Sequence, residues 1–210
     1  TTKQGVKMKK NKSPRNKTLT ITDYEREQYK KSIVYPSQEI ILDSIINKTI
    51  CSDLYKIIDK FPPAFVDLLI IDPPYNLDKD FNGIKFYKSN DDKYLQYLEN
   101  WFSVLINTVK PDGSVYICGD WRNTSCLYEI MKKYTIVRNR ITWQREKGRG
   151  AKKNWKNTTE DIWFGTISDE YYFDVDAVKQ KRRVIAPYKE NGQPKDWEET
   201  ESGNFRLTHP

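Results

Sequence analysis

An unbroken apolar run in the first half of the chain is its clearest structural signal. Residues 66–71 read Val-Asp-Leu-Leu-Ile-Ile, and the run stops at an Asp-Pro-Pro-Tyr segment, residues 72–75. A run of this length bounded by turn residues is typical of a strand buried on both faces in a parallel sheet. The pattern predicts a core strand whose carboxyl end carries Asp72, at the edge where open α/β sheets hold ligands.

Helical periodicity marks further segments on both sides of this strand. The spacing Thr22-x-x-Glu25 is a capping box, which predicts a helix over residues 23–29. An amphipathic stripe predicts a long helix over residues 91–109, and a second helix is expected over residues 124–133. Shorter helices are expected at residues 38–47 and 53–60.

Apolar or alternating stretches predict the remaining strands. They lie at residues 46–51, 114–118, 136–143, 159–165, 171–173 and 184–186. The intervening segments are expected to be a long loop (77–90), a turn (111–113) and a polar, loop-like end (188–210). Strands that alternate with helices predict an α/β fold with a mostly parallel sheet, and the strand pair at residues 136–143 and 159–165 predicts an antiparallel edge.

Composition argues against several classes of chemistry and location. The chain has 210 residues, enough for one domain with a core, and no apolar run approaches the length of a membrane span. Its single histidine is His209 and its three cysteines lack metal-ligand spacing, which argues against catalytic triads, zinc sites and disulfide frameworks. No metal and no membrane partner are therefore expected, and without a secretory segment the protein is expected in the cytoplasm.

Positive charge is concentrated in three stretches of a chain with a net charge of +7. Residues 1–17 carry seven cations and no acid, which is typical of a solvated, disordered tail, and residues 179–183 carry four more cations. Residues 145–156 interleave cations with Trp155 and two glycines, a pattern that favours nucleic-acid contact. The nucleic-acid-binding residues predicted there are Arg145, Lys147, Arg149, Lys152, Lys153 and Lys156.

The Asp72-Pro73-Pro74-Tyr75 segment is suited to holding a planar exocyclic amine. Each proline biases the residue before it towards an extended backbone, so the turn is stiff. The Asp72 carboxylate can accept one N–H of an NH₂ group, and the Pro73 carbonyl can accept the other. Two acceptors on one nitrogen localise its lone pair, and Tyr75 offers a face on which the ring can stack. An ordinary Pro-rich turn after a strand is the alternative.

This tetrapeptide resembles the catalytic motif of the S-adenosylmethionine-dependent amino-methyltransferases that act on nucleic acids, above all the DNA adenine-N6 enzymes of restriction–modification systems. The flanking segments agree in order with the permuted beta group of that family, in which the catalytic half precedes the main cofactor half. These segments are residues 49–54, 110–121, 139–143 and 160–164. The resemblance extends over roughly residues 20–208.

The resemblance implies a Rossmann-like methyltransferase fold. It also implies transfer of a methyl group from S-adenosylmethionine to N6 of a flipped adenine in specific sequences of double-stranded DNA. The implied catalytic residues are Asp72, Pro73, Pro74 and Tyr75, and the implied cofactor contacts are Ser52, Asp53 and Asp72. For Ser52 and Asp53, capping of a short helix is an equal alternative. A homodimer and a cognate restriction endonuclease are possible further partners.

One feature of that group is absent from this sequence. The group carries a Phe-x-Gly-x-Gly cofactor loop downstream, whereas the only Gly-x-Gly here is Gly148-Arg149-Gly150, within the basic stretch. We therefore expect an incomplete fold whose missing C-terminal half, or a second polypeptide, carries the Gly-rich cofactor loop. The expected parts are a basic disordered tail (1–19), a catalytic methyltransferase part (20–187) and a loop leading towards missing target-recognition and cofactor-loop segments (188–210).

Other hypotheses are compatible with the same residues. The same fold could act on cytosine N4, on adenine in RNA or on a glutamine side chain, although Asp72 and Tyr75 favour adenine. The alternative from another class is a non-catalytic DNA-recognition subunit with a vestigial motif. The intact motif argues against that alternative, whereas the missing glycines argue for it.

Overall fold

The computed structural model describes residues 20–36, 40–81, 83–145, 153, 155, 157–185 and 187–208. The chain divides into two compact units, Thr1–Pro62 and Pro63–Pro210. No described helix is long and apolar enough to cross a membrane. In the same ranges, no group of three or more His, Cys, Asp or Glu side chains could hold a metal ion.

The first unit is built from short elements. Its α1 helix (Asp23–Lys30) confirms the predicted capping box: the Thr22 hydroxyl accepts from the N–H of Glu25 at 3.2 Å, and the Glu25 carboxylate accepts from the N–H of Thr22 at 2.7 Å. The other elements are β1 (Ile33–Val34), α2 (Leu42–Ile45), β2 (Thr49–Ile50) and the 3₁₀ helices η1 (Leu54–Lys56) and η2 (Ile58–Lys60). β1 and β2 pair in parallel. The elements expected between residues 38 and 60 are therefore present but shorter than predicted.

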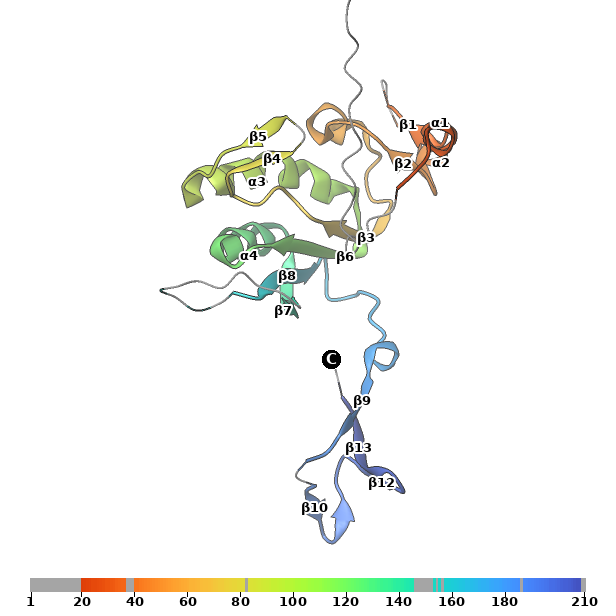
Figure 1. The fold of residues 1–210 in the computed structure, drawn as a ribbon, viewed down its shortest axis with the longest axis vertical. Helices are drawn as coiled ribbons and strands as arrows, with labels where there is room; N and C mark the ends of the chain where they lie inside the picture. The colour runs from red at the N-terminus through yellow and green to blue at the C-terminus, as the bar shows by residue number, and fades with distance from the viewer. Residues whose placement is uncertain are drawn as a thin grey trace, which may run out of the picture. The chain divides into compact units, whose positions relative to one another are not determined.

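A four-stranded sheet forms the centre of the second unit (Figure 1). In order, its strands are β3 (Val66–Ile71), β6 (Val109–Gly119), β8 (Thr159–Thr166) and β7 (Ile136–Gln144). β3 and β6 are parallel, whereas β8 is antiparallel to both of its neighbours. A strand forms over residues 66–71 as predicted, and the α/β class and the antiparallel edge are confirmed. The expectation that this strand is buried on both faces is wrong, because β3 stands at the end of the strand order and none of its residues is buried. Because β3 and β6 are parallel, their carboxyl ends meet at the same edge of the sheet.

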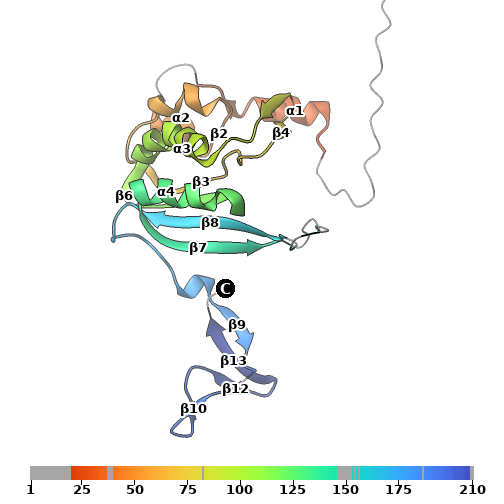
Figure 2. The same cartoon turned by 90° about the vertical axis from the view of Figure 1, so that its left-hand side faces the viewer.

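Two helices of this unit pack together against the sheet (Figures 1 and 2). They are α3 (Asp91–Leu105), which follows the motif, and α4 (Thr124–Tyr134), which η4 (Trp121–Asn123) precedes. The fully buried Val115 and Ile117 of β6 lie on the covered face. Gly165 allows α4 to approach closely, because a Cβ atom at this position would lie 2.8 Å from the methyl carbon of Met131.

The opposite face of the sheet is only partly covered. Phe164 of β8 lies against Tyr171 and Phe173 from the segment that follows it, with ring centroids 6.0 and 5.9 Å apart. Near β3 this face is open to solvent, and Leu68 and Ile70 are 52% and 66% exposed. Apolar strand residues on this face therefore remain in contact with solvent.

β6 begins earlier than the sequence predicts. The helix expected over residues 91–109 ends at Leu105, and a short 3₁₀ helix, η3 (Ile106–Thr108), leads directly into the strand. The turn predicted at residues 111–113 is wrong, because these residues lie inside β6. The ladder between β3 and β6 shifts its register near its start, and a bulge of this kind accommodates proline and glycine within a strand.

Antiparallel hairpins occupy segments that the sequence predicts as loops. The loop expected over residues 77–90 contains β4 (Lys79–Phe81) and β5 (Ile84–Phe86), which pair with each other. The loop-like end expected over residues 188–210 is also wrong, because most of it is strand. Its strands are β10 (Lys189–Glu190), β11 (Gln193–Pro194), β12 (Glu198–Thr200) and β13 (Gly203–Thr208).

The C-terminal strands form a small module with β9 (Gln180–Arg183), which follows η5 (Asp176–Val178). β12, β13 and β9 form a three-stranded antiparallel sheet in that order. The described residues of the stretches 171–173 and 184–186, which were expected to be strands, are not in strands. Polar composition masked the true strands, although Asn191-Gly192, with φ of 53° and 83°, is a two-residue hairpin turn that the sequence does announce.

Candidate active site

The Asp-Pro-Pro-Tyr segment begins where β3 ends, at Ile71. Pro73 is buried, and the Pro74 carbonyl accepts a hydrogen bond from the Tyr94 hydroxyl of α3 at 3.2 Å. The two prolines are therefore fixed against the helix layer, while Asp72 stays exposed at the end of the strand.

Three side chains from neighbouring strands lie at this edge of the sheet. Strand alternation places Asp72, Cys118 of β6 and Glu160 of β8 on the face that the helices leave uncovered. Burial, followed by the negative charges of Asp72 and Glu160, raises the pKa of the Cys118 thiol above its usual value. A thiol that stays protonated is a poor nucleophile, so Cys118 is assigned no part in the chemistry. Glu160 forms an ion pair with Arg145 at 2.6 Å.

Tyr75 is partly buried and interacts with Asp72. Burial is the largest cause that raises the pKa of its phenol, followed by the carboxylates of Asp72 and Glu160 and by a hydrogen bond with Asp72. The phenol therefore remains neutral and can donate its proton to the Asp72 carboxylate. The Tyr75 phenol thus lies near the carboxylate that the sequence singled out.

Asn76 fixes the β4–β5 hairpin beside the motif. Asn76 is buried, and its amide N–H donates to the Ser89 carbonyl at 2.8 Å, while its Oδ1 accepts from the Ser89 N–H at 2.7 Å. Nearer to the hairpin, the Asp78 carboxylate accepts from the N–H of Lys88 at 2.9 Å. The chain between residues 76 and 89 is thus a closed excursion with the hairpin at its tip.

A hollow of about 450 Å³ lies against the motif and this hairpin. Its lining consists of the motif residues 72–75 together with Lys79, Phe86 and Glu160. This volume is in the range of sites that hold small molecules or single bases. The lining combines two carboxylates and one ammonium group with the aromatic rings of Tyr75 and Phe86.

The arrangement offers two acceptors to an exocyclic amine. Asp72 is exposed at the hollow, and within the described residues no hydrogen bond reaches the Pro73 carbonyl. Both groups can therefore accept the N–H bonds of one NH₂ group, as the sequence predicts. Tyr75 and Phe86 add flat apolar surface for an attached ring.

The cofactor residues predicted from the resemblance lie in the first unit. The Asp53 carboxylate caps η1 by accepting from the N–H of Tyr55 at 3.1 Å, and the Ser52 hydroxyl is 3.4 Å from the Asp53 carbonyl. The capping role that the sequence allowed for Asp53 is therefore present. Asp72, the third predicted cofactor contact, belongs to the second unit.

Most of the predicted basic loop lies outside the described residues. Of its six cations, Lys147, Arg149, Lys152 and Lys156 are outside them, as is the Gly148-Arg149-Gly150 segment. Arg145 lies just beyond β7 and pairs with Glu160, so it also touches the catalytic edge. Lys153 and Trp155 are exposed, Trp155 by 97%. The predicted tail, residues 1–19, also lies outside the description.

The sequence did not single out the residues of the hairpin segment beside the hollow. Lys79 and Phe86 lie in the segment predicted as a loop (77–90) and Asn76 precedes it, and none of the three was singled out. One signal could have identified them: Asn82-Gly83 between Phe81 and Ile84 is a hairpin dipeptide.

Comparisons with known proteins identify a family that the chain resembles. Residues 66–203 match a family model, N6_N4_Mtase, that is described as DNA methylase. The type II methyltransferase M.HpaI of Haemophilus parainfluenzae is 29% identical over 135 residues, which cover 63% of this chain and 43% of that protein. The DNA adenine methyltransferase YhdJ of Escherichia coli (strain K12) is 29% identical over 141 residues, which cover 63% of this chain and 47% of that protein.

The chain thus spans less than half the length of these two curated relatives. Among solved structures, a PvuII DNA methyltransferase (cytosine-N4-specific) has a TM-score of 0.49 and 14% sequence identity. The match covers 61% of this chain and 51% of that one.

Proposed function

The chain belongs to the DNA methylase family N6_N4_Mtase, and from this membership we propose that it supplies the amine-binding part of an S-adenosylmethionine-dependent DNA methyltransferase of a restriction–modification system. The observation that carries the proposal is the pair of acceptors, Asp72 and the Pro73 carbonyl, beside a hollow with aromatic walls. The target proposed for this site is N6 of adenine in double-stranded DNA.

The residues of the site have distinct tasks in this reaction. Asp72 and the Pro73 carbonyl accept the two N–H bonds, so the nitrogen lone pair leaves conjugation with the ring and points away from both acceptors. Tyr75 and Phe86 hold the ring, which must leave the base stack to enter the hollow. When bound, S-adenosylmethionine supplies a methyl group on a positively charged sulfur. The amine must lose one proton after methylation, and Asp72 lies in position to accept it.

Two carboxylates are proposed as cofactor contacts, Asp53 in the first unit and Asp72 in the second. A nucleoside-bearing cofactor also needs close backbone approach, which glycines provide. No Phe-x-Gly-x-Gly segment occurs in the sequence. We therefore assign the cofactor loop to a C-terminal half or a second polypeptide and retain Ser52 and Asp53 as proposed contacts.

The exposed edge strand of the sheet supports the proposal of a further polypeptide segment. β3 is an edge strand, and no strand of the described ranges pairs with its other edge. Its sequence is apolar at five of six positions, and Leu68 and Ile70 are exposed. An apolar edge strand without cover is a liability for a soluble protein, so a further polypeptide layer here would remove both the open edge and the exposed apolar surface.

The basic loop completes the proposed DNA-binding surface. Arg145 connects it to the motif through Glu160, and Lys153 and Trp155 are exposed. Lys147, Arg149, Lys152 and Lys156 remain proposed phosphate contacts from the charge pattern alone. A homodimer and a cognate endonuclease remain proposed partners.

Cytosine N4 is the second candidate target, because the family model covers N6 and N4 enzymes alike. Asp72 and Tyr75 at the ends of the motif favour adenine, and one relative, YhdJ, carries adenine in its name. The two targets differ in ring size, so the product identifies the one that the hollow accepts.

Methyl transfer from labelled S-adenosylmethionine to duplex DNA, followed by identification of the nucleoside, tests the proposal. The chain is assayed together with a polypeptide from the family that carries the Phe-x-Gly-x-Gly loop. We expect N6-methyladenine, and none with an Asp72→Ala chain. N4-methylcytosine would replace the adenine assignment, and the absence of any methylated nucleoside would contradict the proposed function.

A further inference from the structure

Two arginines face each other across neighbouring strands of the C-terminal module. Arg182 of β9 and Arg206 of β13 are directly opposite in the antiparallel ladder, so their side chains leave the same face of the sheet. Both side chains are exposed. Like charges in directly opposite positions destabilise a sheet, so this pairing lowers the stability of the module, and the fold itself gives no reason for it.

No ion pair within the described residues offsets this repulsion. Within the described residues, neither Arg182 nor Arg206 forms an ion pair, although the chain pairs many of its other cations. Examples in the same unit are Lys110–Asp67, Lys133–Glu99 and Arg138–Asp169, each at 2.6 Å. The module itself pairs Lys195 with Glu190 at 3.2 Å. The two guanidinium groups are thus among the described cations that form no ion pair.

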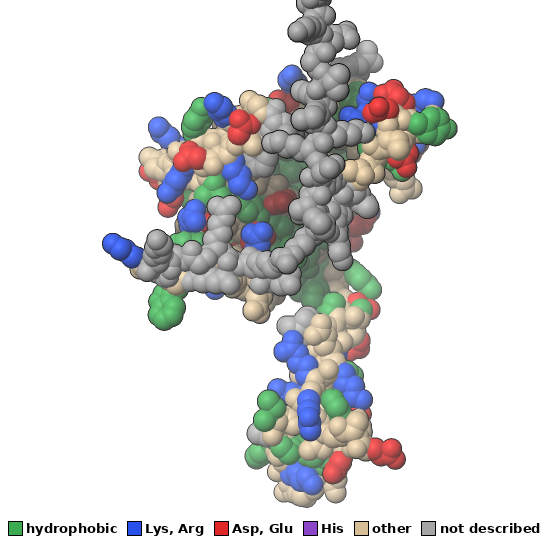
Figure 3. All heavy atoms as spheres, viewed as in Figure 1, with side chains coloured by type: hydrophobic (Ala, Val, Ile, Leu, Met, Phe, Trp, Pro, Cys, Tyr) green, Lys and Arg blue, Asp and Glu red, His purple; other side chains and the backbone are tan. Residues whose placement is uncertain are grey.

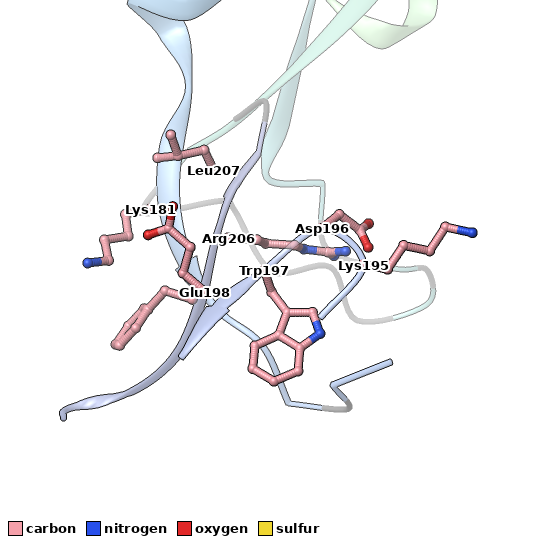
Figure 4. Close-up of a pocket in the computed structure, with 8 residues that line it drawn as sticks. Lys181, Lys195, Asp196, Trp197, Glu198, Arg206 and Leu207 are labelled. Atoms are coloured by element: carbon pink, nitrogen blue, oxygen red, sulfur yellow. The ribbon is translucent and has the colours of Figure 1, made fainter. Parts of the chain in front are cut away.

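A hollow of about 500 Å³ adjoins Arg206 (Figure 4). Lys181, Lys195 and the aromatic rings of Phe205 and Trp197 also line it, together with the carboxylates of Asp196 and Glu198. Trp197 is 8% exposed, and its indole N–H donates to the Tyr188 carbonyl at 2.7 Å, so this wall is fixed. Several Lys and Arg side chains gather on the face of the module that Figure 3 displays.

We propose that Arg182 and Arg206 form a clamp for a backbone phosphate of duplex DNA, as a contact additional to the basic loop at residues 145–156. Guanidinium groups that leave one face of the sheet from opposite positions can both donate to the oxygens of one phosphate, whose negative charge would offset their repulsion. A narrow antiparallel sheet of this kind can also enter the major groove. The inference rests on the proposed function for the choice of DNA as the partner.

The double variant Arg182→Gln with Arg206→Gln tests the clamp in the full chain. Affinity for a duplex of about 30 base pairs is measured by fluorescence anisotropy at several salt concentrations, without cofactor. Loss of this one phosphate contact should reduce the slope of log affinity against log salt by about 0.9, which is roughly 8-fold in affinity at 0.1 M salt. The control, Lys93→Gln with Lys132→Gln, removes the same charge from exposed positions on α3 and α4 and should leave the slope unchanged.

Two further measurements separate the clamp from a structural role. Arg182→Gln alone should raise the thermal unfolding midpoint, because it removes the repulsion, while it weakens DNA binding. Arg182→Lys with Arg206→Lys should retain the salt slope. An unchanged slope in the double Gln variant, or an equal loss in the control, would overturn the inference.

The competitor identifies the partner. Unlabelled duplex should displace the labelled DNA, whereas polyglutamate of matched charge should not; equal displacement by both would mean a general anion site and would overturn the assignment to DNA phosphate. Binding is measured without methyl transfer. A chain that binds DNA through Arg182 and Arg206 but never methylates it would therefore contradict the proposed function and leave the clamp inference standing.

Discussion

Asn76 and Ser89 lie 13 residues apart and are joined by three hydrogen bonds. These bonds close the base of the excursion that carries the β4–β5 hairpin. They therefore connect the Asp-Pro-Pro-Tyr motif, which ends one residue before Asn76, to Phe86 on the far wall of the hollow. The geometry of the hollow depends on a side chain that has no chemical role of its own.

Asn76→Ala should loosen this hairpin without removing any reacting group. The substitution leaves the Ser89 N–H without its acceptor, which typically costs about 1–3 kcal/mol of unfolding free energy. Urea unfolding measures the loss, and hydrogen exchange should be faster at residues 79–86. The control is Asn100→Ala, whose exposed amide accepts only from Gln96 at 3.0 Å and should change stability by less than about 0.5 kcal/mol. Equal stability of the two variants would refute the role of Asn76.

Asp72→Ala should reduce methyl transfer by about 10²–10³-fold, because one preorganised acceptor of the amine is lost. Asp72 is exposed, so the thermal unfolding midpoint should hardly change. The rate is measured with the Gly-rich companion present, at saturating cofactor and DNA. Near-normal turnover by this variant would remove Asp72 from the mechanism.

Tyr75→Phe should retain most activity, whereas Tyr75→Ala should lose considerably more, because stacking needs only the ring.

The Tyr75 phenol should also make the stability of the protein depend on pH. Its pKa is raised in the fold, chiefly by burial, so its contribution to stability is present below about pH 10 and is lost as the pH rises further. Unfolding free energies of wild type and Tyr75→Phe, measured from about pH 8 to 11, should therefore converge at the alkaline end. Tyr94, whose pKa is raised as well, is present in both proteins and cancels. Curves that stay parallel would show that the Tyr75 phenol is not held neutral.

Phe86→Ala should weaken binding of the target base more than it affects the chemical step. A DNA duplex with 2-aminopurine at the target position reports entry of the base through its fluorescence. The affinity should fall several-fold, since stacking of one base on one ring contributes about 1–3 kcal/mol. Ile84→Ala provides the control, because Ile84 lies on the same strand but is 66% exposed and does not line the hollow. Equal effects of both substitutions would mean that Phe86 supports the hairpin and not the base.

The sequence predicted the parts of the fold that depend on local apolar patterns. The strand at residues 66–71, the capping box at Thr22 and the strand pair β7–β8 all form where the pattern places them, although the first of these strands is not buried as expected. The errors lie where polar chains pair with each other. β4–β5 and the C-terminal module have few buried side chains, so no apolar alternation marks them, and only their turn dipeptides do.

Parts of the site could not be predicted for a different reason. Asp72 and Tyr75 follow a recognisable strand, so their place at the sheet edge could be inferred. The pairing of Glu160 with Arg145 and the contact of Phe86 with the hollow depend on segments far apart in the sequence. The opposition of Arg182 and Arg206 depends on a strand register that no local pattern fixes.

In the proposed function, the amine-binding residues belong to this chain and the glycine-rich part of the cofactor site belongs to another segment. Isothermal titration of S-adenosylmethionine into the 210-residue chain tests this division most directly. We expect weak or undetectable binding by the chain alone and stoichiometric binding once a polypeptide with the Phe-x-Gly-x-Gly loop is added. Tight, stoichiometric binding by the chain alone would contradict the account, because the cofactor site would then be complete without those glycines.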